Sequence, residues 1–242
     1  MSTEAIQTNH LTKRYKDKTA VDKLNLTVHR GELYALLGVN GAGKSTTIKM
    51  LSCLTKPTDG TATVLGKSIT DDTEAVKKIM NVSPQETAVA AKLSVRENLE
   101  FIAKIYGFTA KEAAQKANQM IEQFEMEDIA RQKAGTLSGG WQRRLSIAMA
   151  LISEPQVLFL DEPTLGLDVL ARRELWKTIE KLKGSITVIL TTHYLEEAEA
   201  LSDRIGIMAK GSLRAEGTAA ELKQRAGTDD FEEAFIRIAG EG

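Results

Sequence analysis

The segment GVNGAGKS, residues 38–45, has the composition of a loop that binds phosphate. It fits the pattern G-x-x-x-x-G-K-[ST], whose glycines allow backbone N–H groups to turn toward one anion. Lys44 can reach the β and γ phosphates of a nucleotide as a point charge, and the Ser45 hydroxyl can ligate Mg²⁺. The pattern requires a strand before it and a helix after it, and the apolar residues at 33–37 and 45–54 favour both. A glycine turn followed by a chance lysine is the alternative interpretation.

Two adjacent acids, Asp161 and Glu162, follow the apolar segment VLFL at 157–160. If this strand ends beside the glycine loop, Asp161 can hold Mg²⁺, directly or through water. Glu162 can then orient and deprotonate an attacking water as a general base. The same two acids also fit the solvated start of a turn at Pro163. The glycine loop in the same chain favours the chemical interpretation.

Hydrophobic periodicity predicts an α/β fold in which strands alternate with helices around a mostly parallel sheet. We expect strands at 24–28, 33–37, 61–65, 79–83, 157–160, 186–191, 204–209 and 212–216. We expect helices at 45–54, 95–105, 111–124, 141–152, 171–183, 194–201, 218–226 and 230–238. The predicted fold is a P-loop NTPase core with an N-terminal antiparallel β subdomain and an inserted α-helical subdomain.

These elements predict one domain over residues 1–242. Its core would comprise residues 1–85 and 153–217, and residues 86–152 would form the helical subdomain. Residues 218–242 would add C-terminal helices.

Composition excludes several classes of protein. The 242 residues contain 32 Lys and Arg against 33 Asp and Glu, so that the net charge of −1 gives no case for nucleic acid as a partner. The single cysteine, Cys53, excludes an internal disulfide and a zinc site built on several thiolates. The N-terminus does not have the pattern of a signal peptide, and no stretch approaches the roughly 18 apolar residues that cross a bilayer.

Taken together, the motifs resemble the nucleotide-binding subunit of an ATP-binding cassette (ABC) transporter. The resemblance runs from about Ile6 to the C-terminus. Its motifs stand in the family's order: the phosphate loop (residues 38–46), Gln85, the signature segment LSGG (137–140), the strand and acids at 157–162, LGLD at 165–168, and His193. The signature segment ahead of the acidic strand makes the resemblance specific to this family.

The resemblance implies an ATPase that works as a head-to-tail pair of subunits, with MgATP between them. Ser138, Gly139 and Gly140 would bind a phosphate of the ATP held by the partner's loop, at the N-terminus of a helix. Taken alone, these three residues also fit a plain helix cap. Asp168 would cross the interface near the partner's site, although it too fits a helix cap.

Three further residues acquire roles from the resemblance. Gln85 would meet Mg²⁺ or the attacking water and report nucleotide to the transport partner. His193 would hydrogen-bond the γ-phosphate, and Tyr15 would stack its ring on adenine. Without the family, each of the three has a structural alternative: a loop residue, a strand-end histidine and an aromatic packed on the core.

The motifs together predict residues for nucleotide binding, for Mg²⁺ binding and for catalysis. We expect the nucleotide to contact Tyr15, Gly38, Asn40, Gly41, Ala42, Gly43, Lys44, Ser45, Thr46, Ser138, Gly139, Gly140 and Asp168. The expected Mg²⁺ ligands are Ser45, Gln85 and Asp161. The expected catalytic residues are Lys44, Gln85, Glu162 and His193. One position departs from the family, since Trp141 stands where Gln is usual, and we expect ATP binding to survive because the phosphate contacts lie in residues 138–140.

The C-terminal segment DDFEEAFIRI, residues 229–238, resembles the closing helix of drug and polysaccharide exporter ATPases, as does Ile105-Tyr106-Gly107. We therefore expect an exporter subunit, with an importer subunit or a non-transport ABC ATPase as alternatives. A P-loop kinase is a further rival, but that class lacks the signature segment. The expected partners are a second ATP-binding subunit and membrane permease subunits that dock near residues 86–106. These would hold the protein on the inner face of the cell membrane.

Overall fold

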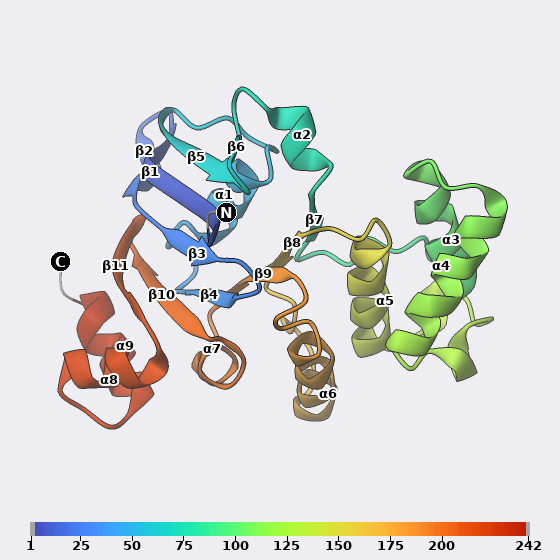
Figure 1. Cartoon of the computed structure of the whole chain (residues 1–242). Coiled ribbons are helices and arrows are strands. Elements are labelled where there is room, and N and C mark those ends of the chain that lie inside the picture. The colour runs from blue at the N-terminus through green and yellow to red at the C-terminus, as the bar shows by residue number, and fades with distance from the viewer. Residues whose placement is uncertain (1–2, 241–242) are drawn as a thin grey trace.

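The computed structural model describes residues 3–240 and contains two sheets with helices packed around them (Figure 1). Residues 1, 2, 241 and 242, which belong to the predicted single domain, lie outside the described part of the chain. The larger sheet has six strands in the order β11-β10-β4-β9-β8-β7. The smaller has five strands, with β3 paired to β1 of the row β2-β1-β5-β6.

The strands of the six-stranded sheet are parallel except at the edge formed by β10 and β11. Its strands are β4 (Leu33–Leu37), β7 (Met80–Ser83), β8 (Val157–Asp161), β9 (Thr187–Thr192), β10 (Arg204–Ala209) and β11 (Ser212–Gly217). Only β10 and β11 run antiparallel. Every residue of β4, β8 and β9 is buried, as expected for central strands that are covered on both faces. This double burial explains why these strands appear in the sequence as continuous apolar runs.

The five-stranded sheet is antiparallel and is built from the first third of the chain. Its strands are β1 (Glu4–Tyr15), β2 (Lys18–Leu24), β3 (Thr27–His29), β5 (Asp59–Val64) and β6 (Lys67–Ser68). One hydrophobic cluster joins this sheet to the six-stranded sheet and includes Leu11, Val64 and Phe159. Helix α1 (Lys44–Leu51) contributes Ile48 to the same cluster.

The segment between β7 and β8 is helical and stands to one side of both sheets in Figure 1. It contains α3 (Val95–Ile105), α4 (Ala110–Gln123), two short 3₁₀ turns, η1 (Glu127–Ile129) and η2 (Ala134–Thr136), and α5 (Gly139–Leu151). Capping boxes at Ser94 and Thr109 satisfy N–H groups at the starts of α3 and α4.

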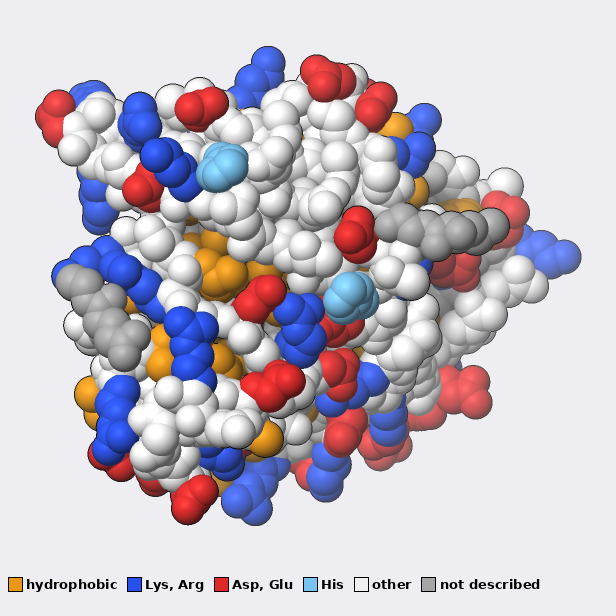
Figure 2. Space-filling view, turned by 60° about the vertical axis from the view of Figure 1, so that its left-hand side comes forward, with side chains coloured by type: hydrophobic (Ala, Val, Ile, Leu, Met, Phe, Trp, Pro, Cys, Tyr) orange, Lys and Arg blue, Asp and Glu red, His pale blue; other side chains and the backbone are white. Residues whose placement is uncertain are grey.

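The remaining helices cover the core and its C-terminal edge. They are α2 (Thr73–Lys77), α6 (Val169–Glu180), α7 (Leu195–Leu201), α8 (Ala219–Ala226) and α9 (Phe231–Gly240). The last two pack beside β10 and β11, where Phe231 and Ile238 join a cluster with Leu37 and Ile207. On the face of the molecule drawn in Figure 2, Lys and Arg are interspersed with Asp and Glu.

The predicted fold class is confirmed, and the differences lie in individual elements. The alternation at 24–28 predicted one strand, but the chain bends there, so that β2 ends at Leu24 and β3 begins at Thr27. The helix predicted at 45–54 ends at Leu51 because Cys53 adopts a left-handed backbone with φ 58°. The strands β1 and β2 were missed, since the predicted strands began at residue 24. The short elements α2 and β6 were not expected either, because neither is long enough to show a hydrophobic period. The predicted subdomain boundaries stay a prediction.

Candidate functional site

The carboxyl ends of three adjacent parallel strands, β4, β8 and β9, meet at one edge of the large sheet. The glycine loop follows β4, Glu162 follows β8 and His193 follows β9. A cleft of about 430 Å³ opens at this edge. It is lined by Lys18, Ala20, Asn40, Gly41, Ala42, Gly43, Lys44, Ser45, Thr46, Gln85, Glu162, Leu165 and His193.

Glycine is required in the loop for two different reasons. Gly43 has a left-handed φ of 106°, and a Cβ built on it would lie 2.5 Å from the carbonyl oxygen of Ala20. Gly38 has no unusual φ, but its Cβ would lie 2.5 Å from the carbonyl oxygen of Met208. The loop therefore passes against neighbouring backbone and leads directly into α1, whose N-terminus attracts anions.

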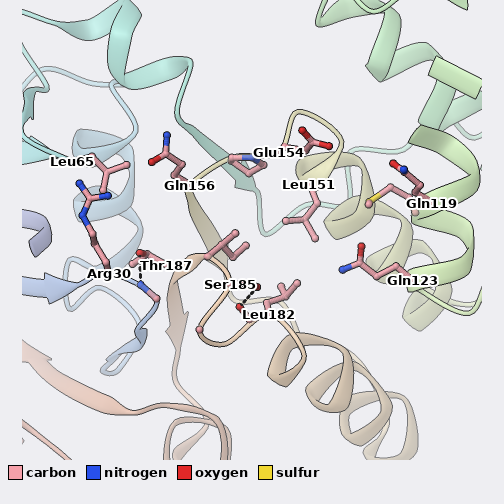
Figure 3. Close-up of a pocket in the computed structure, with 15 residues that line it drawn as sticks. Arg30, Leu65, Gln119, Gln123, Leu151, Glu154, Gln156, Leu182, Ser185 and Thr187 are labelled. Carbon is pink, nitrogen blue, oxygen red and sulfur yellow. Dashed lines mark hydrogen bonds between the residues drawn. The ribbon is translucent and has the colours of Figure 1, made fainter. Parts of the chain in front are cut away.

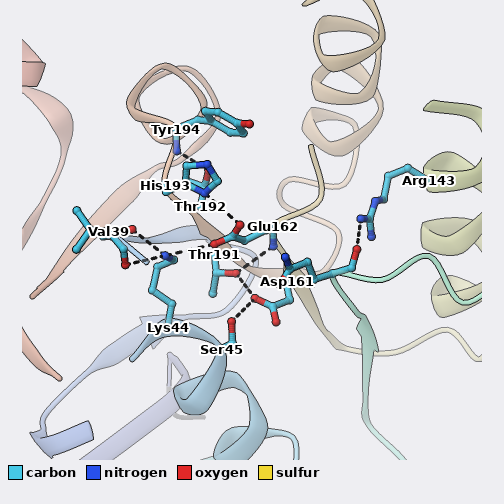
Figure 4. Close-up of polar contacts among 12 residues, drawn as sticks. Val39, Lys44, Ser45, Arg143, Asp161, Glu162, Thr191, Thr192, His193 and Tyr194 are labelled. Atoms are coloured by element: carbon cyan, nitrogen blue, oxygen red, sulfur yellow. Dashed lines mark hydrogen bonds and ion pairs between the residues drawn. The ribbon is translucent and has the colours of Figure 1, made fainter. Parts of the chain in front are cut away.

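Lys44 is the first residue of α1 and is only 4% exposed. Its ammonium group donates to the carbonyl oxygens of Gly38 (2.7 Å) and Val39 (3.3 Å) and lies 3.3 Å from Glu162 Oε1. These contacts hold the positive charge inside the curve of the loop (Figure 4). The charge therefore lies where a terminal phosphate would meet the loop.

Asp161 and Ser45 form an oxygen-rich pair beside that charge. Asp161 Oδ1 accepts hydrogen bonds from Ser45 Oγ (3.0 Å) and from Thr191 Oγ1 (2.5 Å). Hydroxyl and carboxylate oxygens are the ligands that Mg²⁺ prefers, and this ion usually takes one or two of them together with phosphate oxygens. Within residues 3–240 no cluster of three or more His, Cys, Asp or Glu could hold a metal by itself. The donor set thus fits a magnesium ion that arrives with a phosphate ligand.

Glu162 is held at both carboxylate oxygens. Oε1 faces Lys44, and Oε2 lies 3.1 Å from His193 Nδ1 (Figure 4). The residue has a left-handed φ of 46°, and its N–H donates to Thr191 Oγ1 at 3.1 Å. A strained backbone at a buried carboxylate is typical of functional sites. This geometry fixes the position of the Glu162 carboxylate at the cleft.

Gln85 also lines the cleft, although it comes from the segment between β7 and α3. Its main-chain carbonyl accepts a hydrogen bond from Arg143, a buried residue of α5 that also donates to the carbonyl of Pro84 at 2.6 Å. Burial lowers the pKa of Arg143, and the charge of Asp161 opposes this effect. Arg143 was not singled out from the sequence, where it is one of two consecutive arginines behind the signature segment.

The signature segment lies outside this cleft. Ser138 is the N-cap of α5 but makes no side-chain cap hydrogen bond, and its side chain is exposed. A Cβ on Gly140 would lie 3.1 Å from the Cβ of Ala171, so that the start of α5 packs against α6. Asp168 caps α6, where Oδ1 accepts from the N–H of Ala171 at 2.9 Å. Asp168 therefore has the capping role that the sequence left open.

Tyr15 ends β1 and is 46% exposed. Tyr15 itself does not line the cleft. Its partner across the two strands is Lys18, which does line it. The ammonium group of Lys13 lies 5.0 Å from the centre of its ring. Tyr15 is therefore a strand neighbour of one residue of the cleft wall, and adenine stacking stays a prediction.

Thr191 is a site residue that the sequence analysis missed. It links Asp161 to the backbone of Glu162 through its hydroxyl. The one signal available was a polar pair, Thr191-Thr192, at the end of an apolar strand. Lys18 and Ala20 line the cleft without any motif that marks them, whereas Leu165 begins the LGLD segment.

A second cavity, of about 640 Å³, lies at the amino ends of the same strands (Figure 3). Its wall includes Gly31, Gln156 and Ile186, which precede β4, β8 and β9, and Gln119 and Gln123 of α4. Glu154 in this wall is paired with Lys116 at 2.7 Å. The cavity contains no arrangement of acid, base or nucleophile comparable to that around Glu162.

The chain is similar to several known proteins. Residues 21–165 match the family model described as "ABC transporter". The chain is 42% identical to "Daunorubicin resistance ATP-binding protein DrrA3" of Streptomyces coeruleorubidus, over all of this chain and 76% of that protein. It is 41% identical to "Phospholipid-transporting ATPase ABCA3" of Homo sapiens, over 92% of this chain but 13% of that protein.

Two solved structures are similar over most of the chain. "Structure of ATP binding subunit of ABC transporter" has a TM-score of 0.84 and 28% identity, covering 97% of this chain and 99% of that one. "Dimeric structure of a post-hydrolysis state of the ATP-binding cassette MJ0796 bound to ADP and Pi" has a TM-score of 0.78 and 28% identity. It covers 88% of this chain and 98% of that one.

Proposed function

This chain belongs to the ABC transporter family, and we propose that it is the ATP-hydrolysing subunit of a membrane exporter. Its reaction converts ATP and water to ADP and phosphate. One observation supports the assignment above all: the Glu162 carboxylate is fixed between Lys44 and His193 at a cleft whose wall is a glycine loop. The loop binds the phosphates and the carboxylate activates the water.

Each group has a distinct task in this reaction. The N–H groups at the start of α1 and the Lys44 charge bind the β and γ phosphates. Glu162 accepts a proton from the attacking water, while His193 holds the carboxylate and faces the γ-phosphate. Gln85, which also lines the cleft, orients the water. Ser45 and Asp161 would hold Mg²⁺, with Gln85 near it, and the ion would neutralise charge on the phosphate oxygens.

The position of the signature segment supports a dimer. Ser138, Gly139 and Gly140 do not line the cleft of their own chain, and the Ser138 hydroxyl is not used as a cap. A second subunit packed head to tail would bring these residues to the γ-phosphate from outside. ATP then joins the two subunits, and its hydrolysis releases them.

Export is the direction that we propose. One relative, DrrA3 of Streptomyces coeruleorubidus, is named for resistance to daunorubicin. Another, DrrA of Streptomyces peucetius, is named for resistance to daunorubicin and doxorubicin. The latter is 42% identical over 94% of this chain and 69% of that protein. A transport ATPase can confer resistance by removing the drug from the cell, so these names support outward transport of an organic cargo.

The membrane partner would dock at the start of the helical segment. Phe101, Ile105 and Tyr106 of this surface are 50%, 62% and 46% exposed, and Ile105 and Tyr106 line a groove of about 200 Å³. Exposed apolar side chains beside a groove are typical of a protein interface. In residues 3–240 no helix has the length and apolarity to span a bilayer. We propose that the permease, docked on this apolar surface, holds the subunit on the inner face of the cell membrane.

The test combines hydrolysis with assembly. Glu162→Gln keeps the size of the side chain but removes the base, so we expect kcat to fall by about 10²–10⁴-fold while ATP binding persists. The same variant should form a stable dimer with ATP, detectable by size-exclusion chromatography with light scattering. Normal turnover in Glu162→Gln would contradict the assigned base. Phosphate transfer to a small acceptor would favour a kinase.

The docking surface has its own test. A photoreactive residue placed at Ile105 should crosslink to the permease in the native complex, while one placed at the exposed Leu54 should not. Crosslinking that spares Ile105 in the assembled complex would contradict this surface.

A further inference from the structure

Glu197 is a fully buried carboxylate that the proposed reaction does not use. It lies in α7 with 0% exposure, and its Oε1 accepts a hydrogen bond from Trp176 Nε1 of α6 at 3.0 Å. Burial raises the pKa of Glu197, and the nearby Thr192, Thr164, Trp176 and Arg172 oppose this rise. A buried charge is costly unless polar partners compensate it. Its presence here therefore indicates a role in holding α6 and α7 together.

A second set of contacts runs from α6 to the catalytic base. The guanidinium of Arg172 lies 4.4 Å from the centre of the Tyr194 ring, and that ring lies 4.2 Å from the imidazole of His193. His193 Nδ1 is in turn 3.1 Å from Glu162 Oε2. Figure 4 shows Tyr194, His193 and Glu162 in this succession. The position of α6 is thus connected to Glu162 through three direct contacts.

The start of α6 is exposed and apolar. Val169 and Leu170, directly after the cap Asp168, are 62% and 77% exposed. Ala171, in the same turn, packs against Gly140 beside the signature segment. In the proposed dimer this turn faces the second subunit. The partner therefore contacts α6 at the end next to Arg172.

The buried cluster has unused hydrogen-bonding groups. Within residues 3–240, Glu197 Oε2 and Arg172 Nε are buried without a hydrogen-bond partner at good geometry. They belong to side chains of opposite charge, and the Arg172 charge favours the ionised form of Glu197. Unpaired buried polar atoms raise the free energy of a structure.

We propose that Glu197 and Arg172 are positioning residues that link α6 to His193 and so make the His193–Glu162 contact depend on the second subunit. The inference rests on the proposed ATP-driven dimer and adds to it a route by which closure of the dimer reaches the base. Neither residue touches the substrate. Their effect is on kcat, through the placement of His193.

Alanine substitutions in the full chain test the proposal, each compared with the same substitution at the neighbouring residue. Glu197→Ala and Arg172→Ala should each lower kcat for ATP hydrolysis by about tenfold, with the KM for ATP changed by less than about twofold. The exposed neighbours Glu196 and Arg173 are the controls, and their Ala variants should match the unaltered protein. Equal kcat values within each pair would overturn the proposal.

A double-mutant cycle separates positioning from a general structural effect. In a His193→Ala background, Glu197→Ala should cause no further loss in single-turnover hydrolysis, because its route to the base is already absent. The same fold-loss in both backgrounds would overturn the proposal. Glu197→Gln, which keeps an acceptor for Trp176, should recover most of the rate.

A further variant covers loss of folding. If Glu197→Ala does not fold, Trp176→Phe removes the donor and keeps most of the ring, and it should show the same selective fall in kcat. An unchanged kcat in Trp176→Phe would then count against the link. Glu162→Gln assayed in parallel reports on the proposed function itself, so that failure of that assignment is distinguished from failure of this one.

Discussion

Arg143 of helix α5 donates a hydrogen bond to the main-chain carbonyl of Gln85, across 58 residues of sequence. Helix α5 begins with the signature segment, whereas Gln85 faces the cleft of its own chain. One buried side chain therefore joins the part of the subunit that would bind the partner's nucleotide to the part that contacts its own. The two motifs are fixed relative to each other by this contact.

Arg143→Met should lower kcat by about tenfold or more, since the main chain of Gln85 loses its anchor and the glutamine no longer orients water. ATP affinity should change little, because the phosphate loop is intact. Steady-state hydrolysis measures kcat, and equilibrium nucleotide binding measures the affinity for ATP. Arg144→Met is the matched control: Arg144 follows on the same helix but its guanidinium pairs with Glu174 at 3.5 Å and lies over Trp141. A loss of equal size in both variants would contradict a specific role for Arg143.

Lys44→Ala should weaken ATP binding by about 10²-fold or more, because the residue provides the charge that meets the terminal phosphates. The control is Lys49→Ala, since Lys49 lies in the same helix but is exposed. Isothermal titration with ATP and Mg²⁺ measures both. Unchanged affinity in Lys44→Ala would contradict the assigned phosphate loop.

The phosphate loop and the acidic strand could be predicted from the sequence because each is a local pattern. The glycines, Lys44 and Ser45 are contiguous, and Asp161 and Glu162 end one apolar run. In contrast, Thr191 and Arg143 act through contacts between segments that are far apart in the chain. Such contacts follow from the order of strands in the sheet, which hydrophobic periodicity does not give.

In the fold, too, some elements could be predicted from local patterns and others could not. Helix α3 and strand β10 have the predicted bounds, because each has a strong period and clear ends. The bend between Leu24 and Thr27 was not predicted, since the apolar alternation continues through it. Asp168 illustrates a different limit: the residue suits both a helix cap and a subunit interface, and only the cap is visible within one chain.

Asp161→Asn tests the magnesium ligand. Asn keeps an oxygen that can accept from Ser45 and Thr191 but loses the negative charge, so the fold should persist while the site binds Mg²⁺ more weakly. The Mg²⁺ concentration for half-maximal hydrolysis should rise by about tenfold, equivalent to about 1.4 kcal/mol. Thermal unfolding without nucleotide should remain near that of the unaltered protein. An unchanged Mg²⁺ requirement would exclude Asp161 as a ligand.

Gly43→Ala tests the close approach of the loop to its surroundings. Ala at this position must adopt φ 106° and place its Cβ 2.5 Å from the carbonyl oxygen of Ala20. Gly41 is the matched control, because its φ is 83° but its Cβ would have nothing within 4 Å. Backbone strain of this kind costs of order 1–3 kcal/mol, and Gly43→Ala adds a steric clash to it. Urea unfolding should therefore show a larger loss for Gly43→Ala than for Gly41→Ala, and equal losses would mean that the clash with Ala20 is relieved by movement of β2.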